Sequence, residues 1–261
     1  MSSLPFYVEQ GQGDTAVLLL HGVGGGHRAF AETLPLLARA GYRAIAWDAP
    51  GYGASTPIEP LDMKGFADSL RHLVQHIAAK RLVIVGHSMG GMIAQEAMAQ
   101  SSAGIDGLVL FATSPAFGKP GGDWQREFLQ SRFAALDAGL GMAGLAPVLV
   151  GGMLALGTPA HVRAAAVVMM SAVPEATYRA ALAAIVSFNR LENLPHITVP
   201  VLCLACAEDK TAPPVVMERM ADKIPGGSYQ CLPHAGHLGN MEQPDAFNAA
   251  VLQFLQKNFP V

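Results

Sequence analysis

A serine stands in the run Gly86-His87-Ser88-Met89-Gly90, which matches the pattern G-x-S-x-G. The apolar segment Leu82–Val85 precedes this run, and a helix-like segment, Met92–Ala99, follows it. In a tight turn between a strand and a helix, side chains at positions 86 and 90 would clash, which explains both glycines. Such a turn lifts the Ser88 hydroxyl above the sheet, at the positive end of the following helix. Ser88 is therefore predicted to be a nucleophile.

A serine hydroxyl is a poor nucleophile and needs a base. The run His234-Ala235-Gly236-His237 lies near the C-terminus, just after the last predicted strand. His237 is predicted to be the base because it stands at the tip of this loop and is free to reach the serine. His234 is expected to pack or to hydrogen-bond beneath the loop. We interpret His21 and His87 as structural partners of the turns in which they stand.

A carboxylate is needed to hold the imidazole in the correct tautomer and to stabilise the imidazolium ion. The run Ala207-Glu208-Asp209-Lys210 follows the predicted strand Val199–Leu204. Asp209 is predicted to be this acid because it falls past the end of the strand, shortly before the proline that opens a helix. Glu208 is one residue away and is the alternative.

The reaction also needs hydrogen-bond donors positioned to stabilise the negative charge that develops on the carbonyl oxygen. The glycine-rich run His21–His27 follows the strand Ala16–Leu20, and glycine allows its backbone to turn toward the nucleophile. The backbone amides of Val23 and Met89 are predicted to form the oxyanion hole. A phosphate loop is the alternative for these glycines, but no G-K-[ST] follows and the spacing differs from the dinucleotide fingerprint.

Short apolar segments alternate with helical patterns over most of the chain, which predicts a parallel sheet with crossover helices. Most of these segments are continuously apolar, as expected for strands that are covered on both faces. The predicted strands are 16–20, 43–47, 82–85, 107–111, 199–204 and 228–232, with 6–9 as an added edge strand. The predicted helices are 28–40, 63–79, one after Ser88, 213–223 and 244–257.

The alternation stops between residues 114 and 195, where no strand is predicted. Helices are predicted over 124–138, 159–173 and 174–188, with a glycine-rich apolar stretch after the first of them. Thr158 before Pro159 is predicted to be an N-cap followed by a first-turn proline. We interpret 114–195 as a helical cap inserted into a core that comprises 1–113 and 196–261. The alternative is an extra helical layer with no role in the site.

The composition limits the class of protein. The 261 residues are 51% apolar and 14% charged, with a formal net charge of -3, which gives no electrostatic case for nucleic acid or an anionic membrane. The N-terminus does not have the pattern of a signal peptide, and the longest apolar segment, 142–156, is interrupted and too short to span a bilayer. We therefore expect a cytoplasmic monomer or homodimer.

Three cysteines fit a reducing compartment, and two of them, Cys203 and Cys206, form a C-x-x-C pair. Such a pair can indicate redox or zinc chemistry. These two cysteines fall on a predicted buried strand, where positions i and i+3 point to opposite faces. We therefore interpret them as core residues and expect neither a metal nor a cofactor.

Taken together, these segments resemble the α/β-hydrolase superfamily over nearly the whole chain. Its HGxG oxyanion loop corresponds to His21–Gly24, its DxPGxG turn to Asp48–Gly53 and its nucleophile elbow to Gly86–Gly90. Its acid loop matches at Asp209, and its GHxxxxExP segment matches at Gly236–Pro244. The resemblance implies an α/β-hydrolase fold and a Ser88, Asp209, His237 triad. Relatives with haloalkane dehalogenase or epoxide hydrolase activity use an aspartate as nucleophile, and Ser88 argues against both.

Within the superfamily the chain is most similar to the 3-oxoadipate enol-lactonase-like and carboxylesterase group. The short length, the run Thr113–Gly118 and the following Trp124 carry this similarity. True enol-lactonases take a dianionic substrate, for which Arg126, Arg132 and Arg190 are available. The residues expected to contact the substrate are Trp124, Gly22 and His87.

The sequence therefore predicts the hydrolysis of a small carboxylic ester or lactone through an acyl-enzyme. Two other reactions would use the same three residues: cleavage of a carbon–carbon bond in a vinylogous diketone, and cofactor-free perhydrolysis. A protein of another class, a binding protein with an inactive hydrolase pocket, is the remaining alternative. Such proteins typically lose one of the three residues, and here all three are present.

Overall fold

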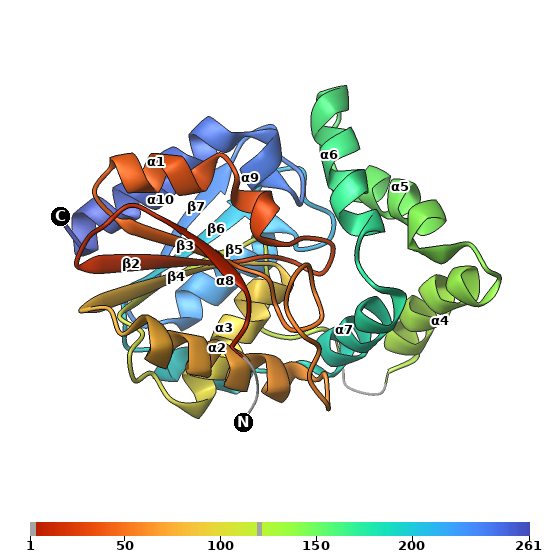
Figure 1. Cartoon of the computed structure of the whole chain (residues 1–261), viewed down its shortest axis with the longest axis horizontal. Coiled ribbons are helices and arrows are strands. Elements are labelled where there is room, and N and C mark those ends of the chain that lie inside the picture. Colours follow the sequence, from red (N-terminus) through yellow and green to blue (C-terminus); the bar gives the residue numbers. More distant parts are fainter. Residues whose placement is uncertain (1–3, 119–121) are drawn as a thin grey trace.

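The computed structural model of the protein describes residues 4–118 and 122–261. In this part of the chain, seven strands form one sheet in the order β1-β3-β2-β4-β5-β6-β7 (Figure 1). The pair β1–β3 is antiparallel and all the other neighbouring pairs are parallel. The strands are β1 (Tyr7–Gln10), β2 (Thr15–Leu20), β3 (Arg43–Trp47), β4 (Arg81–His87), β5 (Gly107–Phe111), β6 (Val201–Cys206) and β7 (Ser228–Leu232). The predicted α/β architecture is confirmed.

Helices cover both faces of this sheet (Figure 1). Helices α1 (Thr33–Arg39) and α10 (Pro244–Asn258) pack on one face, and α2 (Met63–Ile77), α3 (Met89–Gln100) and α8 (Pro214–Lys223) pack on the other. Side chains of β2 alternate between the two cores: Val17 and Leu19 face α1, whereas Leu18 and Leu20 face α2 and α3. Because both faces are covered, every residue of β2 is buried, which is why the strand reads as a continuous apolar run.

Four helices lie together at one side of the sheet, between β5 and β6 in the chain (Figure 1). They are α4 (Asp123–Asp137), α5 (Gly141–Met153), α6 (Ala160–Ser171) and α7 (Glu175–Ser187), and we call them the inserted helices. Three of them were predicted. Helix α5 was not, because its glycines and Pro147 are poor helix formers. The division into a core and a cap stays a prediction.

Some local expectations were wrong. The helix predicted over 28–40 is a short 3-10 helix, His27–Phe30, followed by α1. The residue at the N-cap of α6 is Pro159, and the Thr158 hydroxyl instead lies 2.7 Å from a carboxylate oxygen of Glu242. The opposite orientation of the two cysteines of β6 is confirmed, since Cys203 packs in one core and Cys206 in the other.

Within residues 4–118 and 122–261, no helix has both the length and the apolar character needed to cross a membrane.

Candidate active site

Ser88 stands in the sharp turn between β4 and α3, with backbone angles φ 51° and ψ −116°. A non-glycine residue at positive φ is strained, and such strain collects at functional sites. Both flanking glycines are required, because a Cβ on Gly86 would lie 2.7 Å from the oxygen of Gly90, and one on Gly90 would lie 2.4 Å from the oxygen of Leu20. The Thr113 hydroxyl donates to the Ser88 carbonyl at 2.7 Å, and this hydrogen bond helps to fix the turn.

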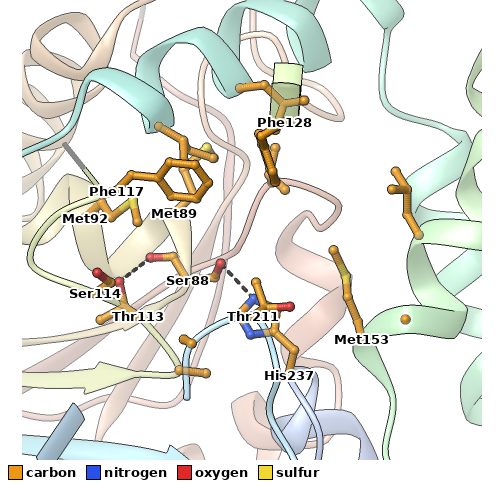
Figure 2. Close-up of a pocket in the computed structure, with 18 of the residues that line it drawn as sticks. Ser88, Met89, Met92, Thr113, Ser114, Phe117, Phe128, Met153, Thr211 and His237 are labelled. Carbon is orange, nitrogen blue, oxygen red and sulfur yellow. Dashed lines mark hydrogen bonds between the residues drawn. The ribbon is translucent and has the colours of Figure 1, made fainter. Parts of the chain in front are cut away.

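The three predicted polar side chains meet at this turn. His237 Nε2 lies 2.9 Å from Ser88 Oγ (Figure 2). On the other side of the ring, His237 Nδ1 lies 2.7 Å from Asp209 Oδ2. The other carboxylate oxygen of Asp209 accepts from the backbone N–H groups of Thr211 and Ala212, at 2.7 and 3.0 Å. Asp209 and His237 are both buried. The aspartate is therefore anchored by its own loop while it holds one nitrogen of the imidazole.

The rival residues lie elsewhere. Glu208 is exposed, and its carboxylate accepts from the backbone N–H of Leu156 at 3.1 Å. His234 is also exposed, with a positive φ of 54°, so the expectation that it packs beneath the loop was wrong. A loop tip that must turn sharply between two short segments leaves this side chain facing outward.

The backbone of the His237 loop is held from several directions. The His237 N–H donates to the Met153 carbonyl at 2.7 Å, and the His237 carbonyl lies 2.8 Å from His87 Nε2. Burial lowers the pKa of His87 to about 3, so its ring is neutral and donates through Nε2–H. The inserted helices thus share in positioning His237, since Met153 ends α5.

Glu242, in the short helix α9 (Gly239–Glu242), completes this support. One carboxylate oxygen accepts from the backbone N–H groups of Gly236 and Leu238, both at 3.1 Å. The other accepts from the Ala155 N–H and the Thr158 hydroxyl, both at 2.7 Å. Glu242 is buried, so it joins the His237 loop to the segment between α5 and α6. The sequence contained Glu242 only as a member of a terminal motif.

The glycine-rich loop is tied to the turn at Asp48. His21 Nε2 accepts from the Ala49 N–H at 3.0 Å, so its Nδ1–H donates to the Gly22 carbonyl at 2.8 Å. Burial lowers the pKa of His21 to about 4, which agrees with a neutral ring that both donates and accepts. The structural interpretation of His21 and His87 fits these contacts.

The amides predicted for the oxyanion hole belong to residues that line the same cavity as Ser88. Val23 follows β2, and Met89 is the first residue of α3, where helical geometry leaves the N–H without a partner. Among the residues that the structure describes, neither amide donates a hydrogen bond. Both are thus available to an incoming oxygen.

Above Ser88 lies a cavity of about 420 Å³, which we call the large chamber. Its walls are mostly apolar and come from the sheet ends and the inserted helices. Trp124 is one of these residues, as expected, and is 55% exposed. In Figure 2, Phe117, Met89 and Met92 lie on the Ser88 side of the Ser88–His237 pair, and Met153 lies on the His237 side.

The other two residues expected to contact substrate, Gly22 and His87, line a second cavity of about 30 Å³, which we call the small chamber. It also reaches Ser88 and His237. Sequence reasoning missed this chamber, because four of its lining residues are methionines, which are ordinary core residues in sequence.

Of the three candidate arginines, only Arg132 lines the large chamber. Its guanidinium stacks 3.6 Å from the centre of the Phe128 ring and donates to the Phe128 carbonyl. Arg190 forms an ion pair with Glu96 at 2.7 Å, and Arg126 contacts Asp123. Outside residues 1–3 and 119–121, no group of three or more histidine, cysteine, aspartate or glutamate side chains is arranged to hold a metal ion.

The sequence profile of the alpha/beta hydrolase family matches residues 17–250. The chain therefore belongs to this family, and it is a hydrolase. It is 30% identical over 266 residues to BpoC of Mycobacterium tuberculosis, whose name is that of a non-heme bromoperoxidase, and the match covers 95% of this chain and 96% of BpoC.

Solved structures agree with this assignment. A thermophilic esterase from Thermogutta terrifontis matches with a TM-score of 0.86 and 27% identity, over 97% of this chain and 93% of the esterase. The enol-lactonase from Burkholderia xenovorans LB400 matches with a TM-score of 0.83 over 96% of each chain. At 22% identity, the second match supports the fold alone.

Proposed function

We propose that this chain hydrolyses a carboxylic ester or lactone with an apolar acyl group, through an acyl-enzyme formed on Ser88. The observation that carries the proposal is the hydrogen-bonded series Asp209–His237–Ser88 at the base of an apolar chamber. The similarity to the Thermogutta terrifontis esterase supports an ester as substrate.

In the proposed mechanism, Ser88 Oγ attacks the ester carbonyl carbon while His237 Nε2 takes the hydroxyl proton. Asp209 keeps the Nδ1–H of the imidazole oriented and stabilises the imidazolium ion. The amides of Val23 and Met89 donate to the oxyanion. His237 then gives its proton to the leaving alcohol and later activates the water that releases the acid.

The chamber indicates which acyl groups fit. Apolar side chains, among them Phe117, Phe128 and Leu182, form most of its walls. Among the described residues that line this chamber, Arg132 is the only lysine, arginine, aspartate or glutamate. Its guanidinium already stacks on Phe128. A dianionic substrate would require a second cation, so the chamber favours an uncharged acyl chain.

The test is acid release from methyl octanoate, followed by titration at constant pH. We expect the wild-type protein to release octanoic acid and Ser88→Ala to lose about 10⁴-fold or more in kcat. Ser131→Ala, at an exposed serine of α4, is the matched control and should keep full activity. Hydrolysis that persists undiminished in Ser88→Ala would refute the proposal.

A further inference from the structure

The two chambers meet at the same reacting atoms. Both are lined by Ser88, His237, Val23 and Met153. An ester whose carbonyl carbon sits on Ser88 Oγ has two arms, the acyl chain and the alcohol. Since the chambers hold about 420 and 30 Å³, the two arms must differ greatly in size.

The position of His237 indicates which arm enters which chamber. The leaving oxygen must lie within reach of His237 Nε2, which protonates it, whereas the acyl chain points away from the imidazole. The small chamber is walled by Leu238, Asn240 and Met241, which directly follow His237 in the chain. The large chamber takes only His237 from this loop and extends on the other side past Met89 and Met92.

We propose that the small chamber receives the alcohol part of the substrate. The substrate is then an open ester of a one- or two-carbon alcohol with a longer apolar acid, and this assignment rests on the proposed function. A lactone fits less well, because its leaving oxygen stays joined to the acyl chain. Ser88 Oγ forms a bond to the carbonyl carbon, the single bond from that carbon to the alcohol oxygen breaks, and the alcohol oxygen takes the proton that His237 Nε2 received from Ser88.

The small chamber has little room for larger groups. Met170 of α6 packs on the glycine-rich loop so closely that a Cβ on Gly24 would lie 2.2 Å from its Cε. Met153, Met169 and Met241 form further walls. A volume of about 30 Å³ accepts one or two small groups, and a longer alcohol would have to displace these methionines.

Asn240 is a polar residue in the wall of the small chamber. Its side chain is buried, and its Nδ2 donates to the Ala29 carbonyl at 2.7 Å. Its Oδ1 has no hydrogen-bond partner among the residues that the structure describes. The Asn240 side chain is therefore held by the Ala29 carbonyl as part of the chamber wall.

The first experiment varies the alcohol at constant acid. We expect kcat/KM for methyl and ethyl octanoate to exceed that for butyl and hexyl octanoate by roughly 10-fold or more, the effect of overpacking a narrow site. The isomers methyl heptanoate and hexyl acetate then exchange the sizes of the two arms. Hexyl acetate hydrolysed as fast as methyl heptanoate, or faster, would overturn the assignment of the chambers.

Two variants test whether the small chamber sets the preference for short alcohols. Met170→Ala widens the small chamber and should raise the butyl-to-methyl ratio of kcat/KM by about 10-fold. Leu182→Ala, which widens only the large chamber, is the matched control and should leave that ratio unchanged. An unchanged ratio in a folded Met170→Ala protein would contradict the proposal.

Transfer of the acyl group to added alcohols tests the same assignment on the wild-type protein. When methanol or butanol competes with water for the octanoyl-enzyme, we expect methyl octanoate to form readily and butyl octanoate to form at least 10-fold less. Equal transfer to both alcohols, with normal hydrolysis, would overturn the chamber assignment and leave the ester hydrolase intact. Absence of hydrolysis with every ester would overturn both.

Discussion

Glu242 is expected to carry a large share of the alignment of His237, although it touches none of the reacting atoms. Its carboxylate accepts four hydrogen bonds, two from the His237 loop and two from the segment that joins α5 and α6. Changing Glu242 to glutamine replaces one accepting oxygen by an NH₂ group. The Thr158 hydroxyl can rotate to accept from that group, but the Ala155 N–H cannot, and it is left without a partner.

The magnitude follows from these contacts. One buried donor without a partner costs about 1–3 kcal/mol, so Glu242→Gln should lower the free energy of unfolding by that amount. Glu242→Ala removes the acceptor of all four donors and should cost at least twice as much. Small displacements of a catalytic group lower rates steeply, so we also expect kcat of folded Glu242→Ala to fall by about 100-fold.

The assay combines urea unfolding with kcat for methyl octanoate, measured at a temperature at which every variant is folded. Glu208→Gln is the matched control, since Glu208 also accepts from the linking segment, at Leu156, but is exposed. It should change the free energy of unfolding by less than about 0.5 kcal/mol and leave kcat unaltered. If Glu242→Ala were as stable and as active as Glu208→Gln, the coupling of the His237 loop to the inserted helices would be wrong.

Two further predictions concern the same loops. Asp209→Asn should keep the fold but lower kcat about 10³- to 10⁴-fold, because an amide in place of the carboxylate favours the wrong imidazole tautomer. Steady-state kinetics measures kcat, and a circular dichroism spectrum checks the fold. A loss in kcat below 10-fold would contradict the role of Asp209. Acid should destabilise the protein, because His21 and His87 have native pKa values of about 4 and 3, below the unfolded value of 6.5. As the pH falls below 6.5, the unfolded chain binds protons that the native rings do not, so stability falls by roughly 2 kcal/mol per histidine by pH 5. Urea unfolding at pH 7 and pH 5 measures this loss, which should shrink by half in His87→Gln, and a pH-independent stability would refute it.

The residues with strong local constraints were the ones that could be predicted. The glycines around Ser88 mark a turn that no other residue tolerates, and the chain order of serine, acid and histidine then limited the search to two short loops. Asp209 was preferred to Glu208 because it falls past the end of the predicted strand and shortly before the proline that opens a helix. The observed hydrogen bond to His237 agrees with that choice, although the strand begins two residues later than expected.

The remaining features depend on contacts between distant segments. Helix α5 is stabilised by packing that overrides its glycines and Pro147, so local propensity misrepresents it. Thr158 has the sequence of an N-cap, yet its hydroxyl is directed to Glu242, 84 residues away. The methionines of the small chamber are indistinguishable in sequence from other core residues, because only the fold brings α6 against the glycine-rich loop.

The inserted helices both position His237 and line the two chambers, and the two roles meet at Met153. Met153 supplies the acceptor for the His237 N–H and also lines both chambers. Two residues further on, Ala155 donates to Glu242, which holds the N–H groups on either side of His237. A change at Met153 that alters which ester fits will thus also displace the base. We expect selection for altered substrate size to succeed at Met170 or Leu182, which have no part in this support, more readily than at Met153.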